Sequence, residues 1–356
     1  MRFIHLSDIR IGSSTESGTG WAETRRKELE GGILRAMQEA ESFGARLVLI
    51  SGGLFSHVPT TGELDRVSRV FASFPDIRVV IIAGQTDIVK RSSPVRSFVW
   101  PENVFFAAGG RVERIVLRDI DTEIFAASVT DTENAGPEDF AAAAGEKHED
   151  SCTVRLALLR CNDDEAAAEA FAGTDLSYAA VGSDISGYRS ISAKVYCPGF
   201  FEPEKMGDSG SHGLIRGIIS DRTGMPESIE FVPMASVSYV PLLIRINVKT
   251  TAEELKMLIE REIGRRGSSN IYRLKLTGNR NPEEDFDLDR LTSVYRISEI
   301  IDETEPEYDY RRLFAEHPQD MIGFYISRIV SDSNEMSRVE KRAMYYGLDA
   351  LLKTEE

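Results

Sequence analysis

The chain has 356 residues, which is long enough for two domains with a substantial buried core. Its 58 acidic and 42 basic residues give a formal net charge of −16, whereas a protein that binds nucleic acid by itself usually has a basic excess. The charge therefore argues against tight autonomous DNA binding, and leaves a local basic cleft or docking on a partner protein as the two alternatives.

The sequence shows no targeting or membrane segment. It begins directly with a strand pattern, without the basic and apolar regions of a signal peptide. No apolar run approaches the roughly 18 residues that a membrane helix requires. The three cysteines lack C-x-x-C spacing, which favours reduced structural thiols over a zinc or redox site; they are Cys152, Cys161 and Cys197. We therefore expect a soluble, cytoplasmic protein.

Three aliphatic runs near the N-terminus predict buried parallel strands that feed loops. The first strand and its turn occupy residues 3–12, the second occupies residues 47–53, and the third occupies residues 79–87. Apolar residues at helical spacing predict a crossover helix over residues 21–43, and a further helix is expected over residues 62–74. Alternating strands and helices of this kind indicate the α/β class.

The middle of the chain predicts a second sheet. Short strands are expected over residues 104–106, 111–117, 123–127, 154–159 and 178–181. Two later strands, over residues 214–219 and 228–232, are expected to complete that second sheet. Residues 133–150 are rich in alanine, glycine and acid, which predicts an acidic surface loop with room for one helix.

The C-terminal third changes pattern. Strands over residues 242–248, 271–276 and 294–300 alternate with a helix over residues 252–263 and a short helix after Pro282, which indicates a β-α-β-α-β unit. Apolar residues three and four apart then predict helices over residues 310–314, 321–329 and 339–352.

Four polar groups have both a structural and a functional interpretation. We interpret the basic triplet Arg25 to Lys27 as the solvated start of a helix, in preference to a phosphate-contacting patch. We interpret His57 as a loop residue in preference to a metal ligand, and His212 as a residue with a packing role. We interpret the acidic residues 163–165 as a helix cap in preference to a metal site, because acidic side chains in the first turn of a helix interact favourably with the helix dipole.

Polar or glycine residues follow five of the predicted strands. They are Asp8-Ile9-Arg10, Gly52-Gly53, Gly84-Gln85-Thr86-Asp87, Arg160 and Gly182-Ser183-Asp184-Ile185. Their order and spacing resemble those of the calcineurin-like metallophosphoesterases, and the nearer resemblance is to DNA double-strand-break repair exonucleases of the SbcD/YhaO type. In that family the motifs read Asp-x-His, Gly-Asp, Gly-Asn-His-Asp, a lone His and Gly-His-x-His. Framework residues also match the family's Tyr-Pro-Gly strand and Gly-x-His-Gly turn, at Tyr196-Cys197-Pro198-Gly199 and Gly210-Ser211-His212-Gly213.

The resemblance implies a four-layer α/β/β/α sandwich with a small α+β capping domain and C-terminal helices. For this chain it implies a core over residues 1–235, a capping domain over residues 236–301 and a helical tail over residues 302–356. In the family, the capping domain helps to position DNA over two metal ions. The C-terminal helices there dock on the base of the coiled coil of an SbcC-type ATPase, and the alternative is that they pack on their own domain.

Only Asp8 keeps its residue type among the seven metal-ligand positions of that family. The other six positions hold Arg10, Gly53, Gln85, Arg160, Ser183 and Ile185, and Thr86 replaces the histidine thought to protonate the leaving group. A residue that bridges two metal ions must be a carboxylate, and glycine has no side chain. Guanidinium groups cannot lose a proton to become metal ligands. The resemblance therefore predicts a protein that has the family's fold but no metal cofactors. We expect it to be a non-catalytic binding or scaffolding subunit that pairs with an SbcC-like ATPase or with a second copy of itself.

Arg10 and Arg160 are expected to converge near Asp8. They would form either an internal ion pair with that carboxylate, which we favour, or a bidentate phosphate site. A different hypothesis keeps catalysis: an Mn²⁺- or Mg²⁺-dependent exonuclease or phosphodiesterase whose rearranged site uses Asp8, Asp87, Asp184 and Gln85. A third is an acidic interaction protein, unrelated to DNA, that acts through its C-terminal helices.

Overall fold

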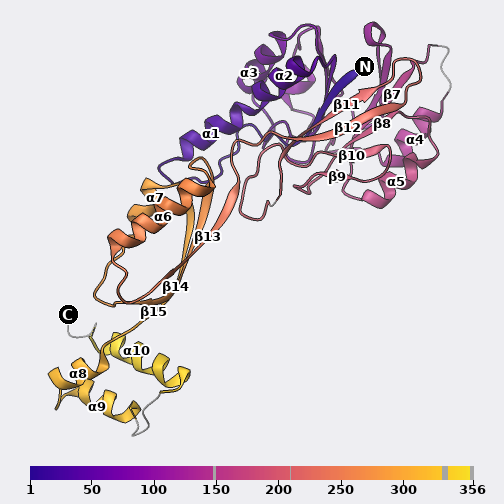
Figure 1. Ribbon diagram of the computed structural model, residues 1–356. Helices are drawn as coiled ribbons and strands as arrows, with labels where there is room; N and C mark the ends of the chain where they lie inside the picture. The colour runs from indigo at the N-terminus through magenta and orange to yellow at the C-terminus, as the bar shows by residue number, and fades with distance from the viewer. Residues whose placement is uncertain (147–149, 209, 331–335, 353–356) are drawn as a thin grey trace. The chain divides into compact units, whose positions relative to one another are not determined.

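The computed structural model describes residues 1–146, 150–208, 210–330 and 336–352. The chain divides into two compact units (Figure 1). The first unit contains Met1–Gly18 and Ala22–Ser238, and the second contains Thr19–Trp21 and Tyr239–Glu356. Residues 147–149 of the predicted acidic loop, and residues 331–335 and 353–356 of the predicted tail, lie outside the described residues.

The first unit contains two large mixed sheets, so the α/β class is confirmed. The first sheet has the order β12-β11-β1-β2-β3-β4. Its four parallel strands are β1 (Arg2–Leu6), β2 (Leu47–Ser51), β3 (Arg78–Ile82) and β4 (Val104–Phe106). Two antiparallel strands, β11 (Gly213–Ile219) and β12 (Pro226–Pro233), extend it beyond β1.

The assignment of three strands to the second sheet was therefore wrong. β4, β11 and β12 all belong to the first sheet. β11 pairs with β1, and Gly217 on β11 leaves room for the ring of Phe3, which a Cβ atom at that position would overlap. Hydrophobic patterning predicts that a strand exists, but it does not specify which strand will be its neighbour.

The second sheet has the order β5-β6-β7-β8-β10-β9. Its strands are β5 (Glu113–Leu117), β6 (Thr122–Ala126), β7 (Val154–Arg160), β8 (Tyr178–Gly182), β9 (Arg189–Ser190) and β10 (Val195–Cys197). β6, β7, β8 and β10 run parallel, whereas β5 and β9 at the two edges are antiparallel to their neighbours.

Alternating side chains place three hydrophobic clusters around these sheets. On β2, Val48 and Ile50 pack against α2 (Gly32–Phe43) and α3 (Thr61–Ala72), whereas Leu47 and Leu49 face the second sheet. A third cluster packs the other face of the second sheet against α4 (Pro137–Gly145) and α5 (Asp164–Ala172). The two sheets thus pack face to face, with helices on their outer faces, because successive side chains on a strand point to opposite sides.

The predicted crossover helix over residues 21–43 is in fact two helices, α1 (Ala22–Glu30) and α2. The break falls at the consecutive glycines Gly31 and Gly32, and a Cβ atom on Gly32 would come within 3.2 Å of the Phe201 ring. Glycine weakens a helix and here permits close packing.

The second unit contains the predicted β-α-β-α-β elements. They are β13 (Tyr239–Ile246), α6 (Ala252–Arg266), β14 (Ile271–Arg280), α7 (Leu288–Val294) and β15 (Ile297–Pro306), and the three strands form a parallel sheet. β15 continues to Pro306, so residues 302–306 lie in a strand and not in the predicted helical tail. The helices that follow are α8 (Tyr310–Glu316), α9 (Met321–Ile329) and α10 (Arg338–Leu352). Among the described residues, none of the helices is long and apolar enough to cross a membrane.

Candidate functional site

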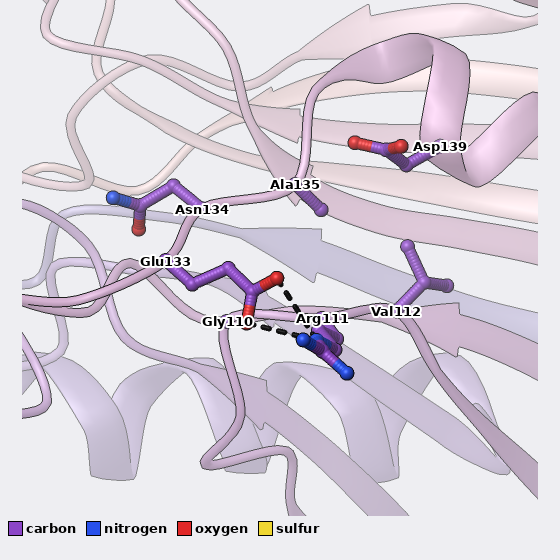
Figure 2. Close-up of a pocket in the computed structure, with 7 residues that line it drawn as sticks. All are labelled: Gly110, Arg111, Val112, Glu133, Asn134, Ala135 and Asp139. Atoms are coloured by element: carbon purple, nitrogen blue, oxygen red, sulfur yellow. Dashed lines mark hydrogen bonds and ion pairs between the residues drawn. The ribbon is translucent and has the colours of Figure 1, made fainter.

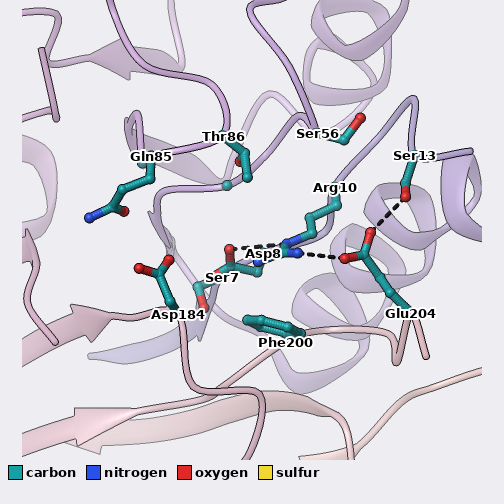
Figure 3. Close-up of polar contacts among 12 residues, drawn as sticks. Ser7, Asp8, Arg10, Ser13, Ser56, Gln85, Thr86, Asp184, Phe200 and Glu204 are labelled. Atoms are coloured by element: carbon teal, nitrogen blue, oxygen red, sulfur yellow. Dashed lines mark hydrogen bonds and ion pairs between the residues drawn. The ribbon is translucent and has the colours of Figure 1, made fainter. Parts of the chain in front are cut away.

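The predicted site residues lie at the carboxyl ends of β1, β2 and β3 in the first sheet and of β7 and β8 in the second (Figure 3). The turn after β1 has an unusual backbone, because Asp8 and Arg10 both adopt positive φ, at 49° and 55°. Two hydrogen bonds hold this turn against the loop after β2: Asp8 N–H donates to Gly52 O at 3.0 Å, and Arg10 N–H donates to Gly53 O at 2.9 Å. Non-glycine residues in this region are strained and cluster at sites that the surrounding structure constrains.

Asp8 lies at the centre of the site and is only 1 % exposed. Arg160, at the end of β7, donates from Nη1 to Asp8 Oδ2 at 2.7 Å. Arg10 places Nε 3.4 Å from Asp8 Oδ1 (Figure 3). Burial raises the pKa of Asp8, and the two arginines oppose that shift. The predicted convergence of both guanidinium groups on Asp8 is therefore present, and it takes the form of an ion pair.

The Arg160 side chain uses its nitrogen atoms for hydrogen bonds within the protein. Its Nη2 donates to Asp184 Oδ1 at 2.9 Å and its Nε donates to Gln85 Oε1 at 3.1 Å. Burial would lower the pKa of this arginine, but Asp8 and Asp184 outweigh that effect and raise it. The side chain is 3 % exposed, and each of its three nitrogens already has a protein acceptor, so it offers little to an external phosphate.

Glycines make the space that Arg160 occupies. A Cβ atom on Gly52 would lie 2.8 Å from Arg160 Cδ, and one on Gly84 would lie 3.3 Å from its Cζ. Gly182 is equally close, at 2.9 Å from Cδ. Gly52 and Gly84 follow β2 and β3, and Gly182 is the last residue of β8. The glycines at these strand ends therefore leave the space in which the buried Arg160 side chain lies.

Arg10 has a partner that the sequence did not reveal. Its Nη1 donates to Glu204 Oε2 at 2.5 Å, and the guanidinium lies 4.0 Å from the centre of the Phe200 ring. Ser13 Oγ donates to the other Glu204 oxygen at 2.6 Å (Figure 3). Glu204 is 194 residues away in the chain and belongs to none of the motifs, so only the folded chain identifies it.

Asp87 has a structural role in this arrangement. Its carboxylate accepts backbone N–H groups from Gly84 at 2.6 Å, and from Gly53 and Phe55 at 3.2 Å each. Burial raises its pKa, and these hydrogen bonds oppose the shift. Its oxygens therefore hold the two loops after β2 and β3 together instead of facing an open coordination site.

The residues present do not fit a two-metal centre. Gly53 has φ +67°, and a Cβ atom added there would overlap the Asp8 carboxylate, so a bridging aspartate has no room. Arg160 fills the space beside Asp8 with a permanent positive charge. Over the part of the chain that the structure describes, no three His, Cys, Asp or Glu side chains are grouped so that they could hold a metal ion.

The remaining motif residues are also engaged locally. Thr86 Oγ1 donates to Phe55 O at 2.8 Å, and the buried Ser183 accepts a hydrogen bond from Arg189 Nη2 at 2.7 Å. Ile185 is exposed and has no polar group to offer. Asp163 caps α5 by accepting from Ala166 N–H at 3.0 Å, which confirms the capping interpretation.

Arg25 differs from both sequence interpretations. It is completely buried, and its Nη1 lies 3.1 Å from the buried Glu202 carboxylate, while its Nη2 donates to Pro203 O at 2.7 Å. Arg25 therefore belongs neither to a solvated helix start nor to a phosphate patch, whereas Arg26 and Lys27 are exposed and pair with Glu23, in agreement with a solvated helix start. His212 is buried between the carbonyls of Phe200 and Asp208, in agreement with the predicted packing role.

A separate cavity of about 330 Å³ lies on the first unit, away from the motifs (Figure 2). It is lined by Gly110, Arg111, Val112, Glu133, Asn134, Ala135 and Asp139. Arg111 Nε donates to both oxygens of Glu133, at 2.9 and 2.8 Å, in an exposed ion pair. The cavity contains none of the predicted site residues. Comparison of the chain with protein-family models gives no match, and comparison with curated proteins gives none either.

Proposed function

We propose that this protein has a metallophosphoesterase-type four-layer sandwich related to the SbcD/YhaO exonucleases, and that it acts as a non-catalytic binding or scaffolding subunit. The observation that carries the proposal is the overlap between a side chain at position 53 and the Asp8 carboxylate, because the bridging carboxylate of a two-metal site would have to stand there. Arg160 then links the two sheets through Asp8 without a metal ion.

Within this proposal, Arg10 and Arg160 are not a phosphate-binding site. Asp8, Asp184 and Glu204 surround the two guanidinium groups, so the cluster carries more negative than positive charge when all groups are ionised. An anionic DNA backbone gains little from such a cluster. The proposal therefore directs attention to a protein partner.

The C-terminal helices supply apolar surface for that partner, which we propose to be the coiled coil of an SbcC-like ATPase or a second copy of this chain. On α9, Met321 is 69 % exposed and Phe324 is 64 % exposed, three residues apart on one side of the helix. Exposed apolar side chains that stand together on one helix face are typical of protein contact sites.

Metal binding tests the loss of the catalytic site. The protein is purified without chelator, its Mn, Fe, Zn and Mg contents are quantified, and Mn²⁺ is titrated by calorimetry. The expected result is no stoichiometric metal, no binding at millimolar Mn²⁺ and no cleavage of single- or double-stranded DNA ends. One or two tightly bound ions, together with nuclease activity that Asp8→Ala removes, would overturn the proposal in favour of a rearranged Mn²⁺ or Mg²⁺ site.

Association tests the partner surface. Light scattering of the full chain, alone and mixed with a candidate coiled-coil ATPase, is compared with that of the Met321→Asp/Phe324→Asp variant. Val99→Asp is the matched control, since Val99 is 88 % exposed and belongs to the first unit. Assembly lost only in the α9 variant is expected. Assembly unaffected by these changes would refute the use of this surface.

A further inference from the structure

Ser56, His57 and Glu63 form a hydrogen-bonded chain just after β2. Ser56 Oγ lies 3.1 Å from His57 Nδ1, and His57 Nε2 lies 3.2 Å from the Glu63 carboxylate. A hydroxyl, an imidazole and a carboxylate in this order are the parts of an activated serine nucleophile, which is recognised by geometry and not by chain position.

Glu63 determines which imidazole nitrogen carries the proton. Burial alone would raise the pKa of Glu63, but hydrogen bonds from the backbone and side chain of Thr60, together with His57, lower it. The ionised carboxylate can only accept, so His57 Nε2 must donate. In the neutral imidazole, Nδ1 then keeps its lone pair and can only accept. The single Ser56 hydroxyl hydrogen has two acceptors within reach, Ile11 O at 3.3 Å and His57 Nδ1 at 3.1 Å, and rotation of the hydroxyl directs it to the histidine. This polarity is the one that general-base catalysis requires.

The surrounding backbone holds the histidine in place. Gly12 has φ +84°, and a Cβ atom there would lie 2.6 Å from His57 Cε1, so the glycine backbone lies directly against the ring. Ser56 N–H donates to Ile11 O at 3.0 Å, which fixes the serine on the same turn. Glu63 is anchored by the capping box with Thr60 at the start of α3, so its carboxylate is held whether or not His57 is present.

We infer that Ser56 is a nucleophile activated by His57 and positioned through Glu63, and that it cleaves small carboxylic esters. Ser56 is half-buried and the His57 side chain beside it is 46 % exposed, so an ester carbonyl in solution can reach the Ser56 hydroxyl. Figure 3 shows the Ser56 side chain directed away from Asp8 and Arg10. The proposed function excludes catalysis at the metal-site positions around Asp8. The inferred activity is separate from that ion-pair cluster, goes beyond the proposed function and requires no metal.

The reaction balances in two steps with water as co-reactant. Ser56 Oγ bonds to the acyl carbon while its proton passes to His57 Nδ1; the bond from that carbon to the alkoxy oxygen breaks, and the leaving oxygen takes the proton. Water then gives a proton to Nδ1 as its oxygen bonds to the acyl carbon. The bond between Oγ and the acyl carbon breaks, and the proton returns to Ser56.

A fluorophosphonate probe tests the nucleophile on the full-length protein in excess EDTA. Attack by Ser56 on phosphorus expels fluoride and leaves a mass increase that peptide mapping locates. p-Nitrophenyl acetate hydrolysis is followed in parallel. Glu63→Gln is the informative variant, because glutamine also serves in a capping box but its amide can donate to the imidazole and no longer fixes the tautomer. Ser73→Ala is the matched control, since its hydroxyl donates to the Arg69 carbonyl at the other end of α3.

The expected result is labelling at Ser56, none in Ser56→Ala, and a rate at least tenfold lower in Glu63→Gln, with Ser73→Ala equal to wild type. Circular dichroism confirms that each variant is folded. Labelling elsewhere, no labelling of the folded wild type, ester hydrolysis unchanged in Ser56→Ala, or a wild-type rate in Glu63→Gln would overturn the inference. Metal analysis of a separate preparation, purified without chelator, reports on the proposed function independently of these outcomes.

Discussion

Acid is expected to destabilise the first unit through His5, a histidine buried between the two sheets. His5 is on β1; its Nδ1 lies 2.9 Å from the Tyr178 hydroxyl on β8, and its Nε2 lies 2.8 Å from Ser51 Oγ on β2. Both of these partners are neutral hydroxyl groups. Burial lowers its pKa from 6.5 to about 3, because the imidazolium would lose its hydration there.

The sign and size of the effect follow from proton linkage. The folded state has the lower pKa, so the unfolded chain binds the proton first, and stability is lost as the pH falls from 6.5 towards 3. At pH 5 an unfolded histidine with pKa 6.5 is almost fully protonated, whereas the folded one is neutral. The difference amounts to about 2 kcal/mol of unfolding free energy between pH 8 and pH 5.

Urea denaturation followed by circular dichroism measures this quantity at both pH values. The difference in unfolding free energy between the two pH values is also measured for His5→Gln and subtracted from that of the wild type. The subtraction removes contributions from the other titrating groups, including the buried carboxyls of Asp8 and Asp87. Glutamine keeps a donor and an acceptor for Ser51 and Tyr178 but does not titrate. The reasoning is refuted if wild type and His5→Gln lose the same free energy on acidification.

Three substitutions around Asp8 test the ion-pair site by the same denaturation assay. Arg160→Ala leaves a buried carboxylate whose remaining cation is the more distant Arg10, and should cost about 3 kcal/mol. Arg111→Ala, in an exposed pair, should change stability little, and equal effects of the two substitutions would contradict the site's role. Gly53→Asp restores the family's residue type, yet strain and overlap should cost about 3 kcal/mol, and calorimetry should detect no new Mn²⁺ binding. Asp87→Asn replaces one acceptor oxygen with a donor facing a backbone N–H and should cost about 2 kcal/mol; an unchanged midpoint would show that the hydrogen bonds matter little.

Local patterns explain why much of the fold could be predicted. The run at β2 is aliphatic at every position but the last, and the burial of all five residues follows directly from that composition. The helices of the second unit begin and end close to the predicted residues, because capping and apolar periodicity are encoded within a few positions, as at α9. Boundaries were less accurate where a pattern fades gradually, as in β15, whose last residues are acidic and read as tail.

Part of the candidate site was also predictable. Asp8 follows β1 and Arg160 ends β7, so the strand pattern placed each residue at a strand end. The two strands belong to different sheets, so it was the order of the motifs in the resemblance that predicted that they meet. Arg25 and Glu204 were not predictable in the same way. Their partners are 177 and 194 residues away, and no local pattern distinguishes a buried arginine at a helix start from a solvated one.

The sequence by itself determined the strands, the helices and the residue types at the strand ends, since these depend on propensity, periodicity and capping within short windows. The tertiary structure decided which strands became neighbours, placing β11 against β1. It also decided that Gly53 and Asp8 exclude a bridging carboxylate, and that Arg160 fills the space beside Asp8. Those outcomes depend on contacts between segments far apart in the chain, whose packing and charge compensation exist only once the two sheets have come together.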